Sequence, residues 1–166
     1  MNTQARQFQL YIVRPTLDFM DVKFTGLAAE RLLVGTMLTE SGGRFIDQKQ
    51  KANDVLGPAV GLWQMERATH DDIWEHYLNH RVDLHQRIGG LKTAWPSEFE
   101  QVAGNNFYAC AMARLKYWRV KSPLPDADDL DGLANYWKMF YNTSEGKGEA
   151  EDFITKAKPI MNLTSD

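Results

Sequence analysis

The hydrophobic positions of this chain follow a helical period along most of its length, and no segment shows a convincing strand-like alternation. Residues 4–20 form the first partly amphipathic segment, with Phe8, Tyr11 and Ile12 on one side. Pro15 lies inside this segment and is expected to kink or end the helix. The pattern as a whole predicts an all-α, mainly helical protein.

The most apolar part of the sequence is expected to be a buried helix. It begins after Thr25, the predicted N-cap, and carries Glu30 in its early turns. Residues 32–39 are apolar apart from one glycine and two threonines, as suits a core helix. Gly42 and Gly43 follow and are expected to stop it.

Capping residues and breakers divide the rest of the chain into further helices. We expect helices from Thr69, as N-cap, to Arg87 or Ile88; from Glu98, after Ser97 as N-cap, to about Val120; from Asp128 or Asp129 through Phe140; and from Glu149 to Lys158. Residues 49–58 are polar and predict a loop or a short helix, and residues 142–148 predict a loop.

Length and composition suit one compact globular domain. The chain has 166 residues, of which 43% are hydrophobic and 25% charged. Its formal net charge of −3 argues against a nucleic-acid binder that relies on a broad positive field. The single cysteine, Cys110, excludes an internal disulfide framework and lies in an apolar run, so we expect it in the core.

Glu40 is the strongest candidate for a catalytic group, because it stands at the end of the apolar helix. A carboxyl group there is partly desolvated, which favours its neutral form and raises its pKa. A general acid working near neutral pH needs such a pKa. An ordinary surface glutamate at this position would instead place its charge against the helix dipole.

The residues around Glu40 carry a recognisable pattern. Residues 39–45 read Thr-Glu-Ser-Gly-Gly-Arg-Phe, and residues 57–69 read Gly-Pro-Ala-Val-Gly-Leu-Trp-Gln-Met-Glu-Arg-Ala-Thr. Together they resemble the soluble lytic transglycosylase family, whose signature is a Glu-Ser pair closing a helix, then Gly-Ala-x-Gly-Leu-(Met or Trp)-Gln and a Thr that starts the next helix. The resemblance implies a lysozyme-like helical fold, with at most a very small β-hairpin, and cleavage of peptidoglycan glycan strands.

The resemblance also implies roles for individual residues. Glu40 would be the catalytic acid, with Ser41 as its hydrogen-bonding neighbour, although a hydroxyl at a helix end bonds equally readily to its own backbone. Gln64 would line the saccharide groove, since its amide offers both a donor and an acceptor. Trp63 could stack on a sugar ring or fill the core, and we favour the core.

The later part of the chain matches the family less closely. Tyr141 and Asn142, followed by residues 146–148, are similar to a late Tyr-Asn-x-Gly-x-Gly element whose tyrosine points at the catalytic Glu. Three residues intervene before the first glycine, and Tyr136 offers a competing alignment. We expect Tyr141, rather than Tyr136, on the Glu40 side, and Tyr141 and Asn142 among the substrate-binding residues.

The sequence also contains residues that could support two other kinds of chemistry. His76 and His80 are four residues apart and align with Asp72 and Asp83, a spacing that can hold a metal. The opposite face of the same predicted helix is apolar, so this polar stripe is expected to face solvent, and no metal site is predicted. The apolar residues are Ile73, Trp74, Tyr77 and Leu84.

A second carboxylate would make a two-carboxylate hydrolase, and Glu66 or Asp54 could supply it. The family resembled here works with one glutamate, so neither is expected to be essential.

The resulting hypothesis is a peptidoglycan lytic transglycosylase that needs no cofactor. We expect an N-terminal helical extension at 1–24, the lysozyme-like domain at 25–158 and a tail at 159–166. The first ten residues lack a signal-peptide pattern, and no transmembrane segment is expected. These features favour a phage-encoded, virion-associated protein that acts in the host cell envelope. Its expected partners are glycan strands and other virion or tail proteins, and not nucleic acid. A lysozyme and a non-catalytic virion structural protein remain as alternatives.

Overall fold

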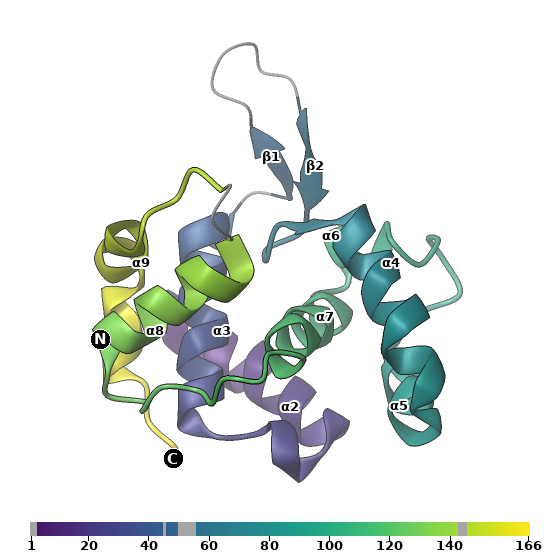
Figure 1. Cartoon of the computed structure of the whole chain (residues 1–166), viewed down its shortest axis with the longest axis horizontal. Helices are drawn as coiled ribbons and strands as arrows, with labels where there is room; N and C mark the ends of the chain where they lie inside the picture. The colour runs from purple at the N-terminus through teal and green to yellow at the C-terminus, as the bar shows by residue number, and fades with distance from the viewer. Residues whose placement is uncertain (1–2, 45, 50–55, 143–145) are drawn as a thin grey trace.

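The computed structural model describes residues 3–44, 46–49, 56–142 and 146–166, and the described chain is mainly helical, as predicted (Figure 1). The α-helices are α1 (Thr3–Phe8), α2 (Arg14–Met20), α3 (Leu27–Glu40), α4 (Arg67–His76), α5 (Val82–Leu91), α6 (Gln101–Gly104), α7 (Asn106–Trp118), α8 (Leu130–Trp137) and α9 (Ala150–Ala157). Two π-helical segments are η1 (Gln9–Val13) and η4 (Lys138–Asn142), and three 3₁₀ segments are η2 (Val22–Phe24), η3 (Leu78–His80) and η5 (Lys158–Asn162). The strands are β1 (Asp47–Lys49), β2 (Leu56–Val60) and β3 (Met65–Glu66).

The first helical segment continues past Pro15 instead of ending there. The π-helical turn η1 directly precedes α2, and Pro15 occupies one of the first two positions of α2. In a π-helical turn the backbone hydrogen bonds join residues five apart instead of four. The shift occurs next to Pro15, which has no N–H to donate. The predicted apolar side was partly wrong, because Tyr11 is 69% exposed while Phe8 and Ile12 pack against the core.

Helix α3 is the buried helix that the sequence predicts. Its residues from Ala29 to Thr39 are all buried, and it ends at Glu40. Gly42 and Gly43 adopt φ values of +65° and +67°, so the glycine stop is confirmed. The predicted N-cap was wrong: Gly26 precedes the helix, and the Thr25 hydroxyl donates to its own preceding turn.

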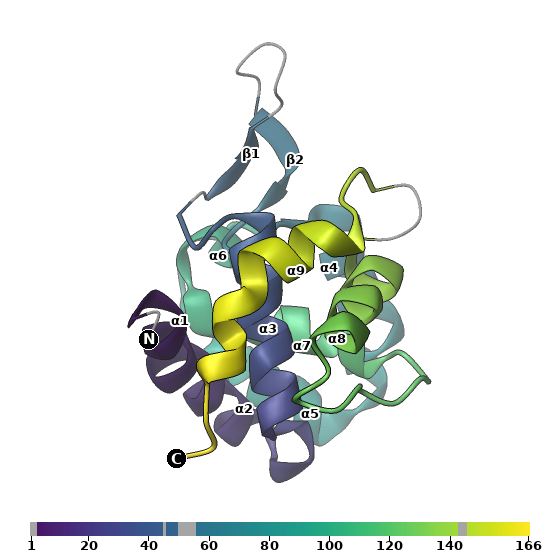
Figure 2. The ribbon, with the colours of Figure 1, turned by 90° about the vertical axis from the view of Figure 1, so that its left-hand side faces the viewer.

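The strands form a small antiparallel sheet in the order β1-β2-β3, and its β1–β2 part projects from the helical body (Figures 1 and 2). The prediction of a loop or short helix over 49–58 was wrong for β2, and residues 50–55 lie outside the described chain. Gly57 and Pro58 disfavour a strand by propensity, but pairing with β3 and an irregular register with β1 accommodate them.

Residues 61–64 form the turn that joins β2 to β3. Gly61 has φ +80°, and a Cβ atom there would lie 2.1 Å from the Val102 carbonyl oxygen. Gln64 also has a positive φ, of 48°. The turn therefore depends on a glycine at its first position, pressed against the chain that leads into α7.

Two predicted long helices are each divided. The segment from Thr69 to Ile88 breaks at Tyr77, and α4 begins earlier than predicted, with Glu66 as its N-cap residue. The segment from Glu98 onward is divided into α6 and α7 by Asn105, whose side chain accepts a hydrogen bond from the Tyr108 backbone N–H. Asn105 therefore follows the last residue of α6 and caps the first turn of α7.

The last two helices begin where the sequence predicts. The Asp129 side chain accepts the Gly132 N–H at 2.8 Å and caps α8. Glu149 and Asp152 form a reciprocal capping box at the start of α9.

Helices α3 and α7 lie in the middle of the molecule, with α4 and α5 on one side and α8 and α9 on the other (Figure 1). Helix α9 packs along α3 (Figure 2). Residues expected to belong to a terminal extension and a tail contribute to the same core, among them Val13, Leu17, Met20, Ile160 and Leu163. No helix in the described parts of the chain is both long and apolar enough to cross a membrane.

Candidate functional site

Glu40 is held at the end of α3 by a contact from α8. The Trp137 indole Nε1 donates to Glu40 Oε1 at 2.9 Å. Trp137 is fully buried, and its ring packs 5.8 Å from the Phe153 ring of α9. The Glu40 residue itself is only partly buried. Trp137 of α8, packed against α9, therefore fixes the position of one carboxyl oxygen of Glu40.

The surroundings of Glu40 favour its neutral form. Burial raises the pKa of the Glu40 carboxyl above its ordinary value, while the Trp137 hydrogen bond and the nearby charges of Lys116 and Lys156 act in the opposite direction. Burial lowers the pKa of the Lys116 ammonium, while the negative charges of Glu40 and Glu66 raise it. The site thus holds a carboxyl group that keeps its proton to higher pH than an exposed glutamate does.

Lys116 and Lys156 bring positive charge to this carboxyl from two helices. Lys116 of α7 donates to the Tyr141 carbonyl at 2.7 Å and lies 4.0 Å from the centre of the Tyr141 ring. Lys156 of α9 donates to the Thr39 carbonyl at 3.3 Å, one residue before Glu40. Both ammonium groups are anchored on backbone oxygens, so their charges have fixed positions relative to the carboxyl.

Tyr141 lies on the Glu40 side of the molecule and is buried. Its hydroxyl donates to the Trp63 carbonyl at 2.7 Å. Burial raises the pKa of Tyr141 well above its ordinary value, and the Glu40 charge adds to that rise. The competing residue Tyr136 donates its hydroxyl to the Ser122 carbonyl at 2.8 Å and therefore points elsewhere.

Ser41 joins the end of α3 to the turn that follows β2. Its hydroxyl donates to the Leu62 carbonyl at 2.7 Å and to the Met37 carbonyl at 3.2 Å, and it accepts the Gly43 N–H at 3.1 Å. The side chain is thus fully engaged with backbone groups. It positions the chain around Glu40 rather than offering a free hydroxyl to a ligand.

The two motif residues of the turn also make backbone contacts. The Trp63 indole is completely buried and donates to the Leu33 carbonyl of α3 at 2.9 Å, consistent with the core interpretation. Gln64 is partly buried and donates from Nε2 to the Gly61 carbonyl at 2.8 Å within its own turn. Its amide oxygen keeps acceptor capacity beyond that contact.

Asn142 and the glycines that follow pack beside Trp137. The Asn142 side-chain oxygen accepts from Lys138 Nζ at 3.1 Å. A Cβ atom at Gly146 would lie 2.3 Å from the Asn142 carbonyl oxygen, and one at Gly148 would lie 2.7 Å from the Trp137 ring. The absence of side chains at Gly146 and Gly148 therefore lets this segment approach the tryptophan that holds Glu40.

Three segments expected from the motif thus meet in space. The end of α3 bonds to the turn at 61–64 through Ser41, and η4 bonds to the same turn through Tyr141. Trp137 and Lys116, which bring α8 and α7 to Glu40, were not predicted. The available signal for Lys116 was its position, with Arg114, in the mostly apolar sequence of α7, and Trp137 lies close to Tyr136 and Tyr141 in the sequence.

The residues of the alternative sites lie apart from this carboxyl or are paired with other groups. Asp72 binds Arg119 at 2.6 Å and His76 at 3.2 Å. Within the described ranges, no group of three or more His, Cys, Asp or Glu residues could hold a metal ion. Glu66 is exposed and contributes to the field at Lys116, and Asp54 lies outside the described residues.

Cys110 is completely buried in α7, and burial raises the pKa of its thiol to about 12. It is therefore a core residue with no nucleophilic character near neutral pH.

Comparisons of this chain with protein-family models, with curated proteins and with solved structures found no match.

Proposed function

We propose that this chain cleaves the glycan strands of peptidoglycan as a lytic transglycosylase on a lysozyme-like scaffold, with Glu40 as its only catalytic carboxyl. One observation carries the proposal: Glu40 closes a buried helix, its carboxyl pKa is raised by burial, and Trp137 fixes one of its oxygens. A carboxyl group in this state is suited to general-acid catalysis near neutral pH.

The reaction begins with a proton transfer. Neutral Glu40 donates its proton to the glycosidic oxygen, and the bond from that oxygen to the anomeric carbon breaks. Positive charge develops at the anomeric carbon, where the N-acetyl group of the substrate's own sugar stabilises it. Glu40, now ionised, removes a proton from a hydroxyl of the same sugar, and that oxygen closes an internal anhydro ring. Neither a cofactor nor a second carboxylate is needed.

The neighbours of Glu40 suit its alternation between acid and base. Trp137 donates to Oε1, which leaves Oε2 to carry the proton. The positive charges of Lys116 and Lys156 stabilise the carboxylate that exists after the first step. Burial and these charges act in opposite directions, so they keep the carboxyl able both to give and to regain a proton.

The proposal includes a setting for this activity. A phage-encoded protein carried in the virion would reach peptidoglycan by delivery with the particle. Tail or other virion proteins would then be its partners.

Digestion of purified peptidoglycan tests the proposed activity. The native protein, Glu40→Gln and the matched control Glu75→Gln, which alters an exposed residue of α4, are compared at equal concentration, with circular dichroism to show that each is folded. We expect Glu40→Gln to lower cleavage by roughly two to four orders of magnitude, towards the severe end because one residue acts twice, and Glu75→Gln to leave it unchanged.

Mass analysis of the fragments identifies the chemistry. Anhydro-terminated fragments from the native protein support the transglycosylase. Ordinary reducing ends would show that water replaces the sugar hydroxyl, as in a lysozyme. The absence of fragments at a dose where a known lysozyme clears the substrate would contradict catalysis and favour a virion structural protein.

A further inference from the structure

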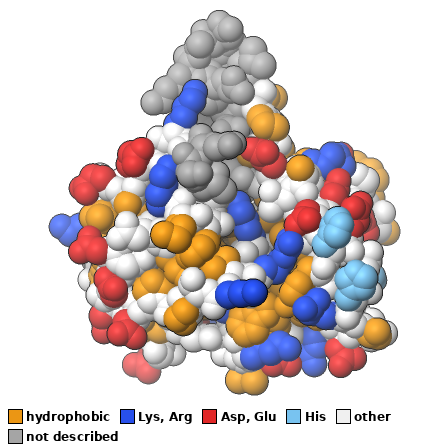
Figure 3. Space-filling view, in the orientation of Figure 1, with side chains coloured by type: hydrophobic (Ala, Val, Ile, Leu, Met, Phe, Trp, Pro, Cys, Tyr) orange, Lys and Arg blue, Asp and Glu red, His pale blue; other side chains and the backbone are white. Residues whose placement is uncertain are grey.

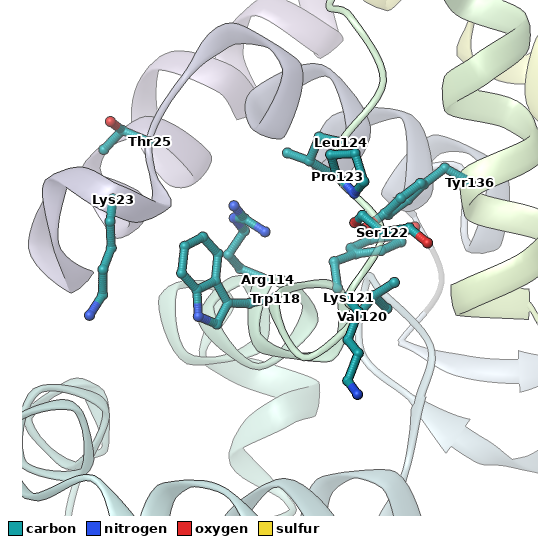
Figure 4. A pocket seen from close by; sticks show the side chains of 11 residues that line it. Lys23, Thr25, Arg114, Trp118, Val120, Lys121, Ser122, Pro123, Leu124 and Tyr136 are labelled. Carbon is teal, nitrogen blue, oxygen red and sulfur yellow. Dashed lines mark hydrogen bonds between the residues drawn. The ribbon is translucent and has the colours of Figure 1, made fainter.

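A cavity of about 440 Å³ opens beside α7 (Figure 4), and its lining includes neither Glu40 nor Trp137. It lies between η2, α7, the segment that follows α7, and Tyr136 of α8. Its volume is within the range of sites that hold small organic molecules. In Figure 3, basic and hydrophobic side chains lie together on the lower central part of the face that carries α7.

Arg114 is the buried charge of this cavity. The residue is only 3% exposed, and Nε donates to the Phe24 carbonyl at 3.1 Å. Its guanidinium stacks on aromatic faces, 5.1 Å from the Trp118 ring and 6.0 Å from the Phe24 ring. In Figure 4 the terminal nitrogens point towards the space between Thr25 and Leu124.

The terminal nitrogens of Arg114 have no hydrogen-bond acceptor within the described part of the chain, and neither is sealed from the cavity. The cation also lacks an acidic partner there, and burial lowers the pKa of its guanidinium to about 10. By contrast, the other buried arginine, Arg31, is bound by Asp128 and by backbone carbonyls. A buried cation without an anion is costly, and a bound anion would offset that cost.

The rest of the lining has the same sign of charge. Lys23 and Lys121 stand at opposite sides of the cavity, and no lining residue is acidic. Trp118, Pro123 and Leu124 provide apolar surface beside the charges. The cavity therefore combines one planar, forked donor, two flexible cations and an apolar wall.

We propose that this cavity binds a small ligand through an oxyanion, a carboxylate or a phosphate group, which Arg114 receives in a two-pronged hydrogen bond while Lys23 and Lys121 close on it from the rim. The forked donor matches the two oxygens of either group. The apolar wall suits an organic body attached to the anion, so the carboxylate of a small aromatic or aliphatic acid is the better fit.

This ligand site is separate from the proposed cleavage site. The cavity lining contains none of the side chains that hold or tune the Glu40 carboxyl, namely Lys116, Trp137 and Lys156, so the two sites use different residues. The inference does not depend on glycan cleavage, and its binding test needs no peptidoglycan.

Calorimetric and thermal-shift titrations test the site with benzoate and with inorganic phosphate, each against sodium chloride at equal ionic strength. We expect saturable binding of at least one probe to the native protein. Tighter binding of benzoate than of phosphate would identify the carboxylate source, and the reverse order would identify the phosphate source; a signal no larger than that of chloride with both probes would overturn the proposal.

Variants locate the binding. Arg114→Gln should weaken it at least about tenfold, because the charged two-pronged contact is lost. Lys23→Gln combined with Lys121→Gln changes two exposed residues and should weaken binding several-fold. This double variant tests the site even where Arg114→Gln does not fold. The matched control Lys158→Gln removes an exposed charge from η5, outside the cavity lining, and should leave binding unchanged.

Equal binding by the double lysine variant and the native protein would place the anion elsewhere and contradict the proposal. The double variant should also retain the native rate of peptidoglycan cleavage. Loss of anion binding with cleavage intact separates this inference from the proposed function.

Discussion

Replacing Glu40 by glutamine should make the folded protein more stable at alkaline pH while removing the proposed activity. Folding raises the pKa of Glu40 because burial disfavours its charged form. The folded protein therefore binds this proton more tightly than the unfolded chain does. That contribution to stability is present at acid pH and is lost as pH rises through the folded-state pKa. The amide of Glu40→Gln stays neutral at every pH, so this variant does not lose stability at this position as pH rises.

Burial on one side, and the Trp137 hydrogen bond with the charges of Lys116 and Lys156 on the other, set the size of the difference. Each unit by which burial raises the pKa corresponds to about 1.4 kcal/mol of lost stability once the group is ionised. The glutamine keeps an oxygen for the Trp137 donor now 2.9 Å from Glu40 Oε1, but a bond to a neutral acceptor is weaker by about 1 kcal/mol. Glu40→Gln is therefore expected to be the more stable protein at pH 8, and each 1 kcal/mol of difference corresponds to about 2–4 °C in melting temperature for a chain of this length.

Melting temperatures of both proteins between pH 4 and pH 9 measure this difference. The curves should approach each other near pH 4, below the ordinary carboxyl pKa of 4.5, and separate as pH rises, with Glu40→Gln the more stable. Glu75→Gln on the exposed side of α4 controls for the loss of one surface charge. A Glu40→Gln curve that lies below the native curve at every pH would refute the reasoning, since it would mean that the ionised carboxylate stabilises the fold.

Three further substitutions test the charge of Lys116 and the surroundings of two glycines. Lys116→Met removes a positive charge that lowers the pKa of Glu40, so the alkaline limb of the kcat/KM profile for the proposed peptidoglycan cleavage should move to higher pH. An unchanged or acid-shifted limb would contradict the effect assigned to this charge. Gly61→Ala should lower the free energy of unfolding by about 2 kcal/mol or more in urea titrations, because the residue has φ +80° and its Cβ would lie 2.1 Å from the Val102 carbonyl oxygen. Gly89→Ala, inside α5 with open space around its Cβ, should instead stabilise by about 0.5–1 kcal/mol, and equal effects at the two glycines would refute the steric argument.

The sequence predicted most reliably those elements that local chemistry defines. The stop of α3 was predicted because the left-handed backbone at Gly42 and Gly43 is a conformation that strongly favours glycine. The starts of α8 and α9 were predicted because Asp129 and Glu149 bond to their own first turns. Such signals involve only a few neighbouring residues, so they do not depend on how distant parts of the chain pack.

Elements fixed by distant contacts were missed. Strand β2 contains Gly57 and Pro58 and exists through pairing with segments on both sides, which no local window reveals. The break between α4 and α5 has no proline or glycine at Tyr77 to mark it. Asn105 does carry a capping signal, but it was hidden within a segment whose apolar spacing favoured one long helix.

The candidate site shows the same division. Glu40 could be inferred because its chemistry depends on the apolar helix that precedes it in the sequence. Trp137 and Lys116 could not, because their importance arises from the packing of α8 and α7 against the end of α3. Propensity and spacing contain no information about which distant side chain will meet a given carboxyl.

The residues that the motif marks and the residues that tune the carboxyl perform different tasks. Ser41 uses its hydroxyl on backbone groups, and it joins the end of α3 to the turn at 61–64. Trp137, Lys116 and Lys156 determine how strongly Glu40 holds its proton. A change in the first set should therefore alter how accurately the carboxyl is placed and lower the proposed cleavage activity at every pH. A change in the second set should instead move the pH at which activity is lost, because it shifts the free energy of ionisation without breaking the connection between α3 and the turn.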